Sequence, residues 1–266
     1  MIFEVQDIHF SYNRHEVLKG VSFHADIGDF ICLLGENGAG KTTLFRCMLG
    51  LLKGYHGTIT VEGDAIEKLS AKQMAKKVAY IPQAHSPAFN YTVLQTVLMG
   101  TSAHVGAFRA PGKQQIQLVE ENLERLGISH LRERGYAEIS GGERQLVLIA
   151  RALAQRSKVL IMDEPTANLD YGNQIRVMEQ IQILAKEGYL ILLSTHNPEH
   201  ALLYSHKVLV LRNGKTDLFG DTREILNETV IGDIYKVPVR IHEIHTGESV
   251  LPVCVPGNLL QPKQIS

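Results

Sequence analysis

Short apolar runs alternate with turns along the first 63 residues of the chain. The runs cover residues 2–8, 17–23, 30–34 and 58–61, and turns such as Ile-Gly-Asp and Glu-Gly-Asp stand between them. Runs of this length, bounded by turn residues, predict β-strands. We expect these strands to form the edge of a mixed sheet.

A helical periodicity appears in two later segments. Residues 114–128 place apolar side chains on one helical face, and Gly127 predicts the end of that helix. The apolar side chains are Ile116, Val119, Leu123 and Leu126. Residues 173–188 are also amphipathic and end at Gly188. Both segments therefore predict helices that turn one face toward a core.

Strands and helices alternate again in the second half of the chain. Residues 158–165 and 189–194 are apolar and rich in branched side chains, and residues 207–220 read as a hairpin. Strands joined by helices form right-handed crossovers, which produce parallel pairing. The sequence thus predicts an α/β fold with a mainly parallel sheet flanked by helices.

Residues 35–43, Gly-Glu-Asn-Gly-Ala-Gly-Lys-Thr-Thr, match the phosphate-binding pattern GxxxxGK[ST]. The glycines let the backbone turn tightly and aim N–H groups at phosphate oxygens. The expected context is present, because an apolar strand at 29–34 precedes the loop and a helix-like run at 44–52 follows it. A helix that begins near Thr42 adds its positive end to the phosphate site.

The lysine and the threonine that follow the loop have separate expected roles. Lys41 would reach the β- and γ-phosphates as a point charge, and the Thr42 hydroxyl would ligate Mg²⁺. The whole segment forms the predicted ATP-binding set. Its members are Gly35, Glu36, Asn37, Gly38, Ala39, Gly40, Lys41, Thr42 and Thr43.

Two carboxylates stand at the end of the apolar strand at 158–165. Asp163 is the expected partner of Mg²⁺, directly or through water, and Glu164 is expected to orient or deprotonate the attacking water. Open α/β sheets place their chemistry at the carboxyl ends of strands. A pair of acids after a strand is usually a solvated loop start, but the phosphate loop outweighs that interpretation here.

A second anion site is predicted at residues 140–145, Ser-Gly-Gly-Glu-Arg-Gln. Two glycines follow Ser140 and lead into a helical stretch at 143–155. Because glycine has no side chain, the backbone N–H groups at this helix N-terminus are accessible to an anion. The chain already has one phosphate loop. This second loop is therefore expected to serve the nucleotide of another copy.

From about Ile2 to about Leu226, these motifs resemble the ATP-binding subunit of an ATP-binding cassette (ABC) transporter. The resemblance implies a P-loop NTPase cassette with a mainly parallel sheet core, an antiparallel β edge subdomain and an inserted helical subdomain. It places the cassette at 1–230, with a RecA-like core at about 1–84 and 156–230 and the helical subdomain at about 85–155. The remaining residues, 231–266, would be a C-terminal extension that packs on the cassette.

The resemblance also implies a head-to-tail homodimer with ATP between the phosphate loop of one copy and the signature loop of the other. Ser140, Gly141 and Gly142 would contact the γ-phosphate in trans, and Glu143 belongs to the same loop. Ile139 and Glu143 stand where leucine and glutamine are commoner. Neither departure changes the residues that contact phosphate.

Four further positions match the family. Tyr12 resembles the residue that stacks on adenine, and Gln83 resembles the glutamine that reaches Mg²⁺ and the attacking water. His196 resembles the switch histidine at the γ-phosphate and, with Glu164, completes the expected catalytic pair. Asp170 resembles the residue that links the two sites across the dimer.

Composition excludes several classes of function. The 266 residues are 44% hydrophobic and carry a net charge of −1 with a pI of about 6.9, so no basic stripe suggests nucleic-acid binding. No apolar run approaches a bilayer span, and Glu4 and Asp7 stand where a signal peptide would be basic and then apolar. The three cysteines suggest neither a disulfide framework nor a zinc cluster. We expect a cytosolic protein that meets the membrane through partners.

The direction and substrate of transport rest on likeness alone. Residues 91–100, 106–115 and 194–201 and the tail at 235–239 resemble the importer branch that serves ferric siderophores, haem, cobalamin and sometimes oxyanions. That branch implies ATP and Mg²⁺ as cofactors, two permease subunits, an extracytoplasmic substrate-binding protein as an indirect partner, and a location at the cytoplasmic face of the cell membrane. The alternatives are an exporter ATPase and a soluble ABC ATPase without a role in transport.

Overall fold

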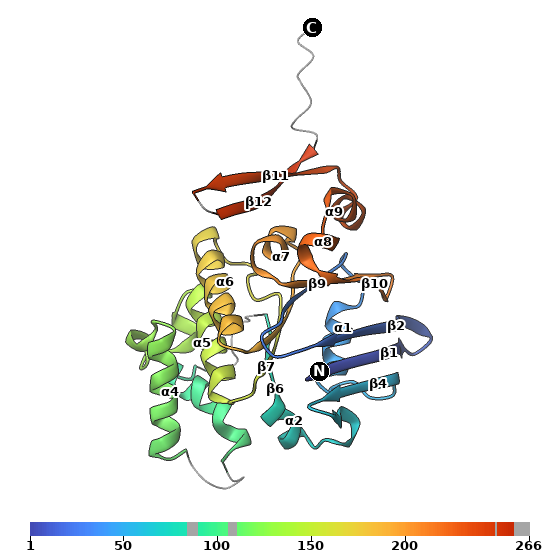
Figure 1. The fold of residues 1–266 in the computed structure, drawn as a ribbon. Coiled ribbons are helices and arrows are strands. Elements are labelled where there is room, and N and C mark those ends of the chain that lie inside the picture. Colours follow the sequence, from blue (N-terminus) through green and yellow to red (C-terminus); the bar gives the residue numbers. More distant parts are fainter. Residues whose placement is uncertain (84–89, 106–110, 248, 258–266) are drawn as a thin grey trace.

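The computed structural model describes residues 1–83, 90–105, 111–247 and 249–257 (Figure 1). Within these residues the strands form three sheets. The central sheet has six strands in the order β10-β9-β3-β8-β7-β6. They are β10 (Lys215–Asp221), β9 (Lys207–Arg212), β3 (Phe30–Leu34), β8 (Leu190–Ser194), β7 (Val159–Asp163) and β6 (Val78–Ile81).

Five strands of the central sheet run parallel, and only β10 pairs antiparallel, through its hairpin with β9. Every residue of β3 and β8 is buried. Parallel strands covered on both faces need such unbroken apolar sequences. The predicted α/β fold with a mainly parallel sheet is therefore confirmed, as is the hairpin at 207–220.

The N-terminal strands form a separate sheet rather than an edge of the central one. Its order is β2-β1-β4-β5, and all its pairs are antiparallel. The strands are β1 (Phe3–Tyr12), β2 (His15–Ala25), β4 (His56–Val61) and β5 (Asp64–Ala65). The two sheets meet where Phe23 packs edge-on against Phe219, with ring centroids 5.9 Å apart.

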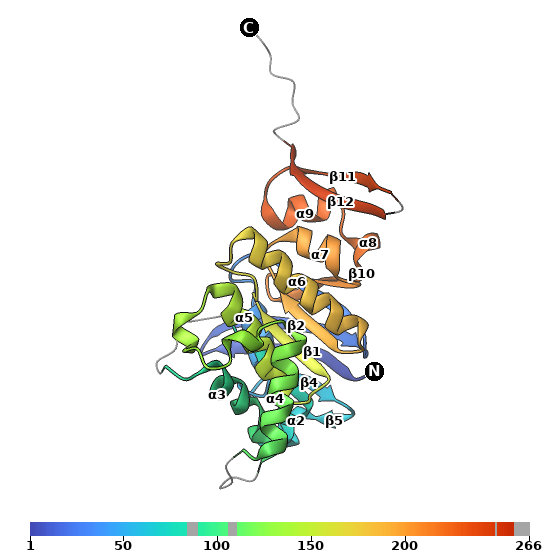
Figure 2. The same cartoon turned by 90° about the vertical axis from the view of Figure 1, so that its left-hand side faces the viewer.

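Helices cover both faces of the central sheet (Figures 1 and 2). One apolar core lies between this sheet and α5, α6 and α7, and the other lies between the sheet, α1 and the antiparallel strands. The helices are α1 (Lys41–Met48), α2 (Ala71–Lys77), α3 (Val93–Leu98), α4 (Lys113–Arg125), α5 (Gly141–Ala154), α6 (Tyr171–Lys186), α7 (Pro198–Tyr204), α8 (Thr222–Ile225) and α9 (Glu228–Tyr235). No helix in the described ranges is long and apolar enough to cross a membrane.

Two helices follow the predicted pattern and two differ at their ends. Helix α4 stops just before Gly127, whose φ of 69° continues the chain in the left-handed region, as predicted. Helix α6 likewise ends before Gly188. The helix expected at 44–52 ends at Met48, because Gly50 adopts a φ of 66°. The helix expected from Glu143 begins at Gly141, because Ser140 caps it.

The C-terminal residues form α9 and a hairpin of β11 (Val239–Thr246) and β12 (Ser249–Pro256). Strand β12 contacts α7 and β11 contacts α9 (Figure 1). The boundary predicted at residue 230 falls inside α9, and Ile231 and Ile234 are buried in the main core. Helix α9 therefore packs into the same core as the residues before it. The boundary predicted at 84/85 and part of the segment at 106–115 lie outside the described residues.

Candidate active site

The carboxyl ends of four neighbouring strands meet at one edge of the central sheet. Strands β3, β8, β7 and β6 are parallel and adjacent, so the residues that follow them gather at that edge. Gly35 follows β3, His196 lies just beyond β8, Glu164 follows β7, and Gln83 lies just beyond β6. Motifs that are far apart in the sequence thus share one site.

The phosphate loop fits tightly between β3 and α1. A Cβ on Gly35 would lie 2.4 Å from the Leu211 carbonyl oxygen, and one on Gly40 would lie 2.9 Å from the Leu18 side chain. Gly40 also has a φ of 102°. No other residue type satisfies both the space and the backbone angle, so the glycines at the two ends of the loop are structurally required.

The Lys41 side chain folds over the loop. Its ammonium donates to the Gly35 carbonyl at 2.7 Å and to the Glu36 carbonyl at 3.1 Å. Burial lowers the pKa of Lys41, while the charges of Glu164 and Asp163 oppose that change. The ammonium is therefore held above the loop and in the electrostatic field of both acids. Thr42 and Thr43 continue the first turn of α1.

A buried serine connects the two acids. The Ser194 hydroxyl donates to Asp163 Oδ1 at 2.6 Å and accepts from the Glu164 backbone N–H at 3.1 Å. Ser194 stands directly opposite Asp163 in the β7–β8 register. By its sequence pattern alone, residue 194 is only the end of a predicted strand. A hydroxyl that ends an apolar strand beside the strand of the acids was the available signal.

Glu164 has a strained backbone. Its φ of 46° lies in the left-handed region, which non-glycine residues rarely occupy. Its carboxylate Oε2 lies 3.4 Å from Nδ1 of His196, whose side chain is 62% exposed. Strain of this kind occurs at functional sites, where surrounding contacts impose it. The arrangement directs the Glu164 carboxylate toward the loop that carries His196.

A second histidine, His200, contacts the loop that carries His196. His200 is buried, and its Nδ1 lies 3.1 Å from the Thr195 hydroxyl, which also accepts from the Asn197 N–H. Burial, with a smaller effect from the nearby His196, lowers the pKa of His200 to about 4. His200 is therefore neutral at physiological pH and fixes the start of α7.

We expect replacement of His200 by asparagine to flatten the acid side of the stability profile. The folded-state pKa of about 4 lies below the ordinary 6.5, so the unfolded chain takes up the proton first. Above pH 6.5 His200 is neutral in both states and does not lower the free energy of unfolding. As the pH falls toward 4, the free energy of unfolding decreases by a total of about 3 kcal/mol, because only the unfolded chain binds the proton. Urea unfolding at several pH values measures it. The exposed His245→Asn variant is the control, and equal pH slopes for both variants would contradict the assignment.

The signature loop is built around a capping box. Ser140 caps α5, since its hydroxyl accepts from the Glu143 N–H at 3.3 Å while the Glu143 carboxylate accepts from the Ser140 N–H at 2.7 Å. These hydrogen bonds lower the pKa of Glu143. Glutamate serves this box as well as glutamine does. The departure at residue 143 therefore has a local structural explanation.

The signature loop packs against the start of α6. A Cβ on Gly142 would lie 2.4 Å from Cγ of Asn173, so this position must be glycine. Asp170 caps α6 by accepting from the Asn173 N–H at 2.9 Å and from its amide Nδ2 at 2.7 Å. Asn173 thus links residues 140–143, by packing, to Asp170, by hydrogen bonds.

Tyr12 and Gln83 lie at the margins of the site. Tyr12 ends β1, is 41% exposed, and meets the Phe10 ring edge-on at 4.9 Å. The next strand brings Val17 and Leu18 against Gly40, so the Tyr12 hairpin stands beside the phosphate loop. Gln83 is half-buried and precedes the undescribed residues 84–89.

The donor atoms at the sheet edge suit a magnesium ion. Thr42 offers a hydroxyl, Asp163 a carboxylate and Gln83 an amide oxygen, all hard ligands. No group of three His, Cys, Asp or Glu side chains in the described ranges could hold a metal by itself. Mg²⁺ usually takes one or two carboxylates together with substrate phosphates and water. The residues present therefore fit Mg²⁺ that arrives with a nucleotide.

Comparison with known proteins identifies the family. The model described as ABC transporter matches residues 18–167, more than half of the chain. An uncharacterized ABC transporter ATP-binding protein of Haemophilus influenzae is 39% identical over 244 residues, covering 91% of this chain and 93% of the relative. A probable iron chelatin transport ATP-binding protein of Helicobacter pylori is 36% identical over 241 residues, covering 90% and 94%. A solved structure described as an inward-facing conformation of a metal-chelate type ABC transporter has a TM-score of 0.86 at 31% identity, covering 97% of this chain and 99% of that one. The chain therefore belongs to the ABC transporter family, as one of its ATP-binding, ATP-hydrolysing subunits.

Proposed function

We propose that this chain is the motor subunit of an importer for a metal chelate, such as a ferric siderophore, haem or cobalamin. The observation that carries the ATPase part is the meeting of the phosphate loop, Asp163, Glu164 and His196 at one sheet edge. The substrate class rests on two relatives, one named for iron chelatin transport and one for metal-chelate transport. They cover 90% and 97% of this chain.

Each side chain at the sheet edge has a proposed role in hydrolysis. Lys41 and the loop amides bind the β- and γ-phosphates and stabilise the charge that develops there. Glu164 orients the attacking water and accepts its proton, and His196 senses the γ-phosphate. Tyr12 stacks on adenine. Ser194 keeps the backbone of Glu164 and the Asp163 carboxylate in fixed relative positions.

Magnesium is the proposed metal cofactor. Thr42, Gln83 and Asp163 would hold it, and when bound it neutralises charge on the phosphates. The Ser194 hydroxyl donates to Oδ1 of Asp163 and so fixes the orientation of this carboxylate toward the metal or its water.

The active unit is proposed to be a head-to-tail homodimer. Ser140, Gly141, Gly142 and Glu143 then face the γ-phosphate held by the other copy, and Asp170 lies where the two copies meet. Support comes from the packing of the signature loop on the start of α6, through Asn173. Any shift of Asp170 at the dimer interface is passed to the signature loop by this contact.

A groove lined in part by Tyr80 is the proposed docking surface for a permease subunit. It has a volume of about 370 Å³ and is open to solvent. Apolar side chains from α2, β6, α5 and the segments that follow α1 and α3 line it, including Leu51, which is 66% exposed, and Met99, which is 43% exposed. An exposed apolar groove of this kind fits an amphipathic segment of a partner.

Tyr80 connects this groove to the catalytic edge. It lines the groove, and burial together with the Asp163 charge raises its pKa to about 12. Strand β6, which carries Tyr80, leads directly to Gln83. Movement of a docked segment would therefore reach two proposed magnesium ligands. This placement supports a location at the cytoplasmic face of the membrane, held there by permease subunits.

The alternatives make different demands on the chain. A soluble ABC ATPase needs no membrane partner, and an exporter ATPase would move substrate outward. The groove favours a membrane partner over a soluble ATPase, and the named relatives favour import over export. An extracytoplasmic binding protein would deliver the chelate to the permease, so this chain itself contacts no substrate and no nucleic acid.

Replacement of Leu51 by glutamate tests the docking proposal. The carboxylate would have to be buried beneath the docked segment, and we expect ATP-dependent uptake of the chelate into vesicles to fall about 10-fold or more. ATP hydrolysis by the isolated subunit should stay within about twofold, because Leu51 lies outside the sheet edge. Ile183→Glu on α6, where Ile183 is 44% exposed, is the matched control. Unchanged uptake by the Leu51 variant would rule out this groove.

A further inference from the structure

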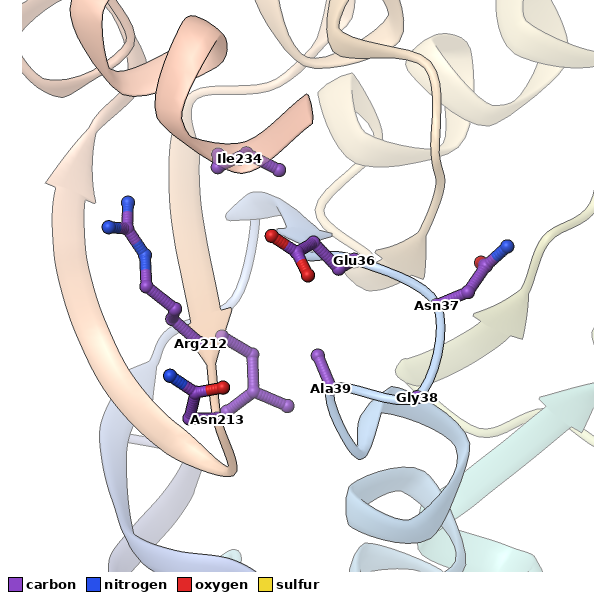
Figure 3. Close-up of a pocket in the computed structure, with 8 residues that line it drawn as sticks. Glu36, Asn37, Gly38, Ala39, Arg212, Asn213 and Ile234 are labelled. Atoms are coloured by element: carbon purple, nitrogen blue, oxygen red, sulfur yellow. The ribbon is translucent and has the colours of Figure 1, made fainter. Parts of the chain in front are cut away.

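The end of α9 lies beside the phosphate loop, although about two hundred residues separate them in the sequence. Ile234 lines a cavity of about 120 Å³ together with Glu36, Asn37 and Gly38. Figure 3 shows Ile234 above the loop and the Glu36 side chain directed into the space between them. The loop that receives phosphate is thus bordered by the last turn of the C-terminal helix.

An ion pair joins the two elements. The Lys236 ammonium lies 3.3 Å from the Glu36 carboxylate and also donates to the Asp233 carbonyl at 2.8 Å. Lys236 ends α9 with a φ of 57° in the left-handed region. Its charge is therefore tied to the helix end by one contact and to the phosphate loop by the other.

Packing fixes the position of this lysine. Ile231 and Ile234 are 0% and 2% exposed, and Tyr235 packs against the main core. The Tyr235 hydroxyl is buried without a hydrogen-bond partner among the described residues. Burial raises the pKa of Tyr235, and the charges of Cys32, Cys254 and Glu164 add to this effect. The end of α9 is thus anchored in the core, within electrostatic reach of the catalytic acid.

Glu36 connects this anchor to the catalytic lysine. Its backbone carbonyl accepts from the Lys41 ammonium, and its side chain pairs with Lys236. An unpaired carboxylate at this place would also repel the phosphates of ATP. Both partners are more than half exposed, so the pair by itself adds little to folding stability. Its effect is expected on the loop and on the anion that the loop binds.

We propose that Lys236 is a positioning residue of the ATPase site. By pairing with Glu36 it holds the phosphate loop in the geometry that receives ATP, and it offsets the negative charge of Glu36 beside the phosphates. The C-terminal segment is then a part of the nucleotide site. This inference rests on the ATPase activity and is independent of the transported substrate.

A double-mutant cycle with Lys236→Met and Glu36→Gln in the full-length chain tests the proposal. We expect Lys236→Met to raise the KM for ATP about two- to fivefold, the range of an exposed ion pair, with kcat within about twofold. In the Glu36→Gln background the same change should leave KM unaltered, because the carboxylate is already gone. Lys236→Arg should restore the wild-type KM.

Arg240→Met is the matched control, since Arg240 pairs with Glu228 in the same segment but away from the loop. It should leave KM unchanged. The proposal is overturned if Lys236→Met leaves KM unchanged, or if its effect persists in the Glu36→Gln background, which would indicate a general charge effect. A fall in kcat with an unchanged KM would likewise overturn it.

Discussion

Replacing Glu164 by glutamine is expected to lower the rate of ATP hydrolysis by about 100- to 10,000-fold while ATP still binds. The amide keeps the shape of the side chain and its position near His196, 3.4 Å away, but it cannot accept a proton from the attacking water. Lys41 and the loop amides are untouched. ATP should therefore accumulate in a closed dimer, which light scattering and a phosphate-release assay would detect together.

The control for this experiment is Glu121→Gln on α4, an exposed carboxylate in the helical part of the cassette. It should hydrolyse ATP at the wild-type rate. Near-normal turnover in the Glu164 variant would mean that another group orients the water.

The trapped variant can also be isolated from its native membranes. A copurifying polytopic permease would support the transport proposal, whereas soluble or ribosomal partners alone would count against it.

Replacing Lys41 by methionine is expected to weaken ATP binding about 10- to 150-fold. Hydrogen bonds to charged groups contribute about 1.5–3 kcal/mol each, and Lys41 supplies the one ammonium that the loop carbonyls hold in place. Methionine keeps the length of the aliphatic stem but has no charge. Titration with a fluorescent ATP analogue measures the loss directly.

Lys113→Met, at the exposed start of α4, is the matched control for this loss of charge. The two active-site variants should behave in opposite ways, because Glu164→Gln binds ATP without turnover and Lys41→Met fails at binding. Wild-type affinity in the Lys41 variant would contradict the phosphate role. A lowered melting temperature without nucleotide would instead assign the lysine to loop stability.

The residues of the candidate site could be predicted from the sequence because each belongs to a short local motif. Gly35 to Thr43 form one continuous segment between a strand and a helix, and Asp163 and Glu164 close another strand. Local spacing determines which atoms such a segment presents. The strand pattern around them also predicted the central sheet, since buried parallel strands need long apolar runs.

Other features depend on contacts between distant segments. The contact of Ser194 with Asp163 depends on the pairing of β8 with β7, which sets the Ser194 hydroxyl opposite Asp163. The N-terminal strands alternate as a sheet edge would, yet they form a separate sheet. Helix α9 crosses the boundary expected at residue 230, and the burial of Ile231 and Ile234 depends on contacts with the distant core.

The sequence by itself determined the chemistry available to this protein: a loop for phosphate, two acids after a strand, and a second anion loop at a helix start. These features follow from backbone geometry over a few residues, which local sequence controls. Only the tertiary structure decided how they combine. The β7–β8–β3 order brought the acids, His196 and the phosphate loop together, and the packing of α9 brought Lys236 to Glu36. Such arrangements depend on which surfaces bury the most apolar area against each other, and no local pattern encodes that.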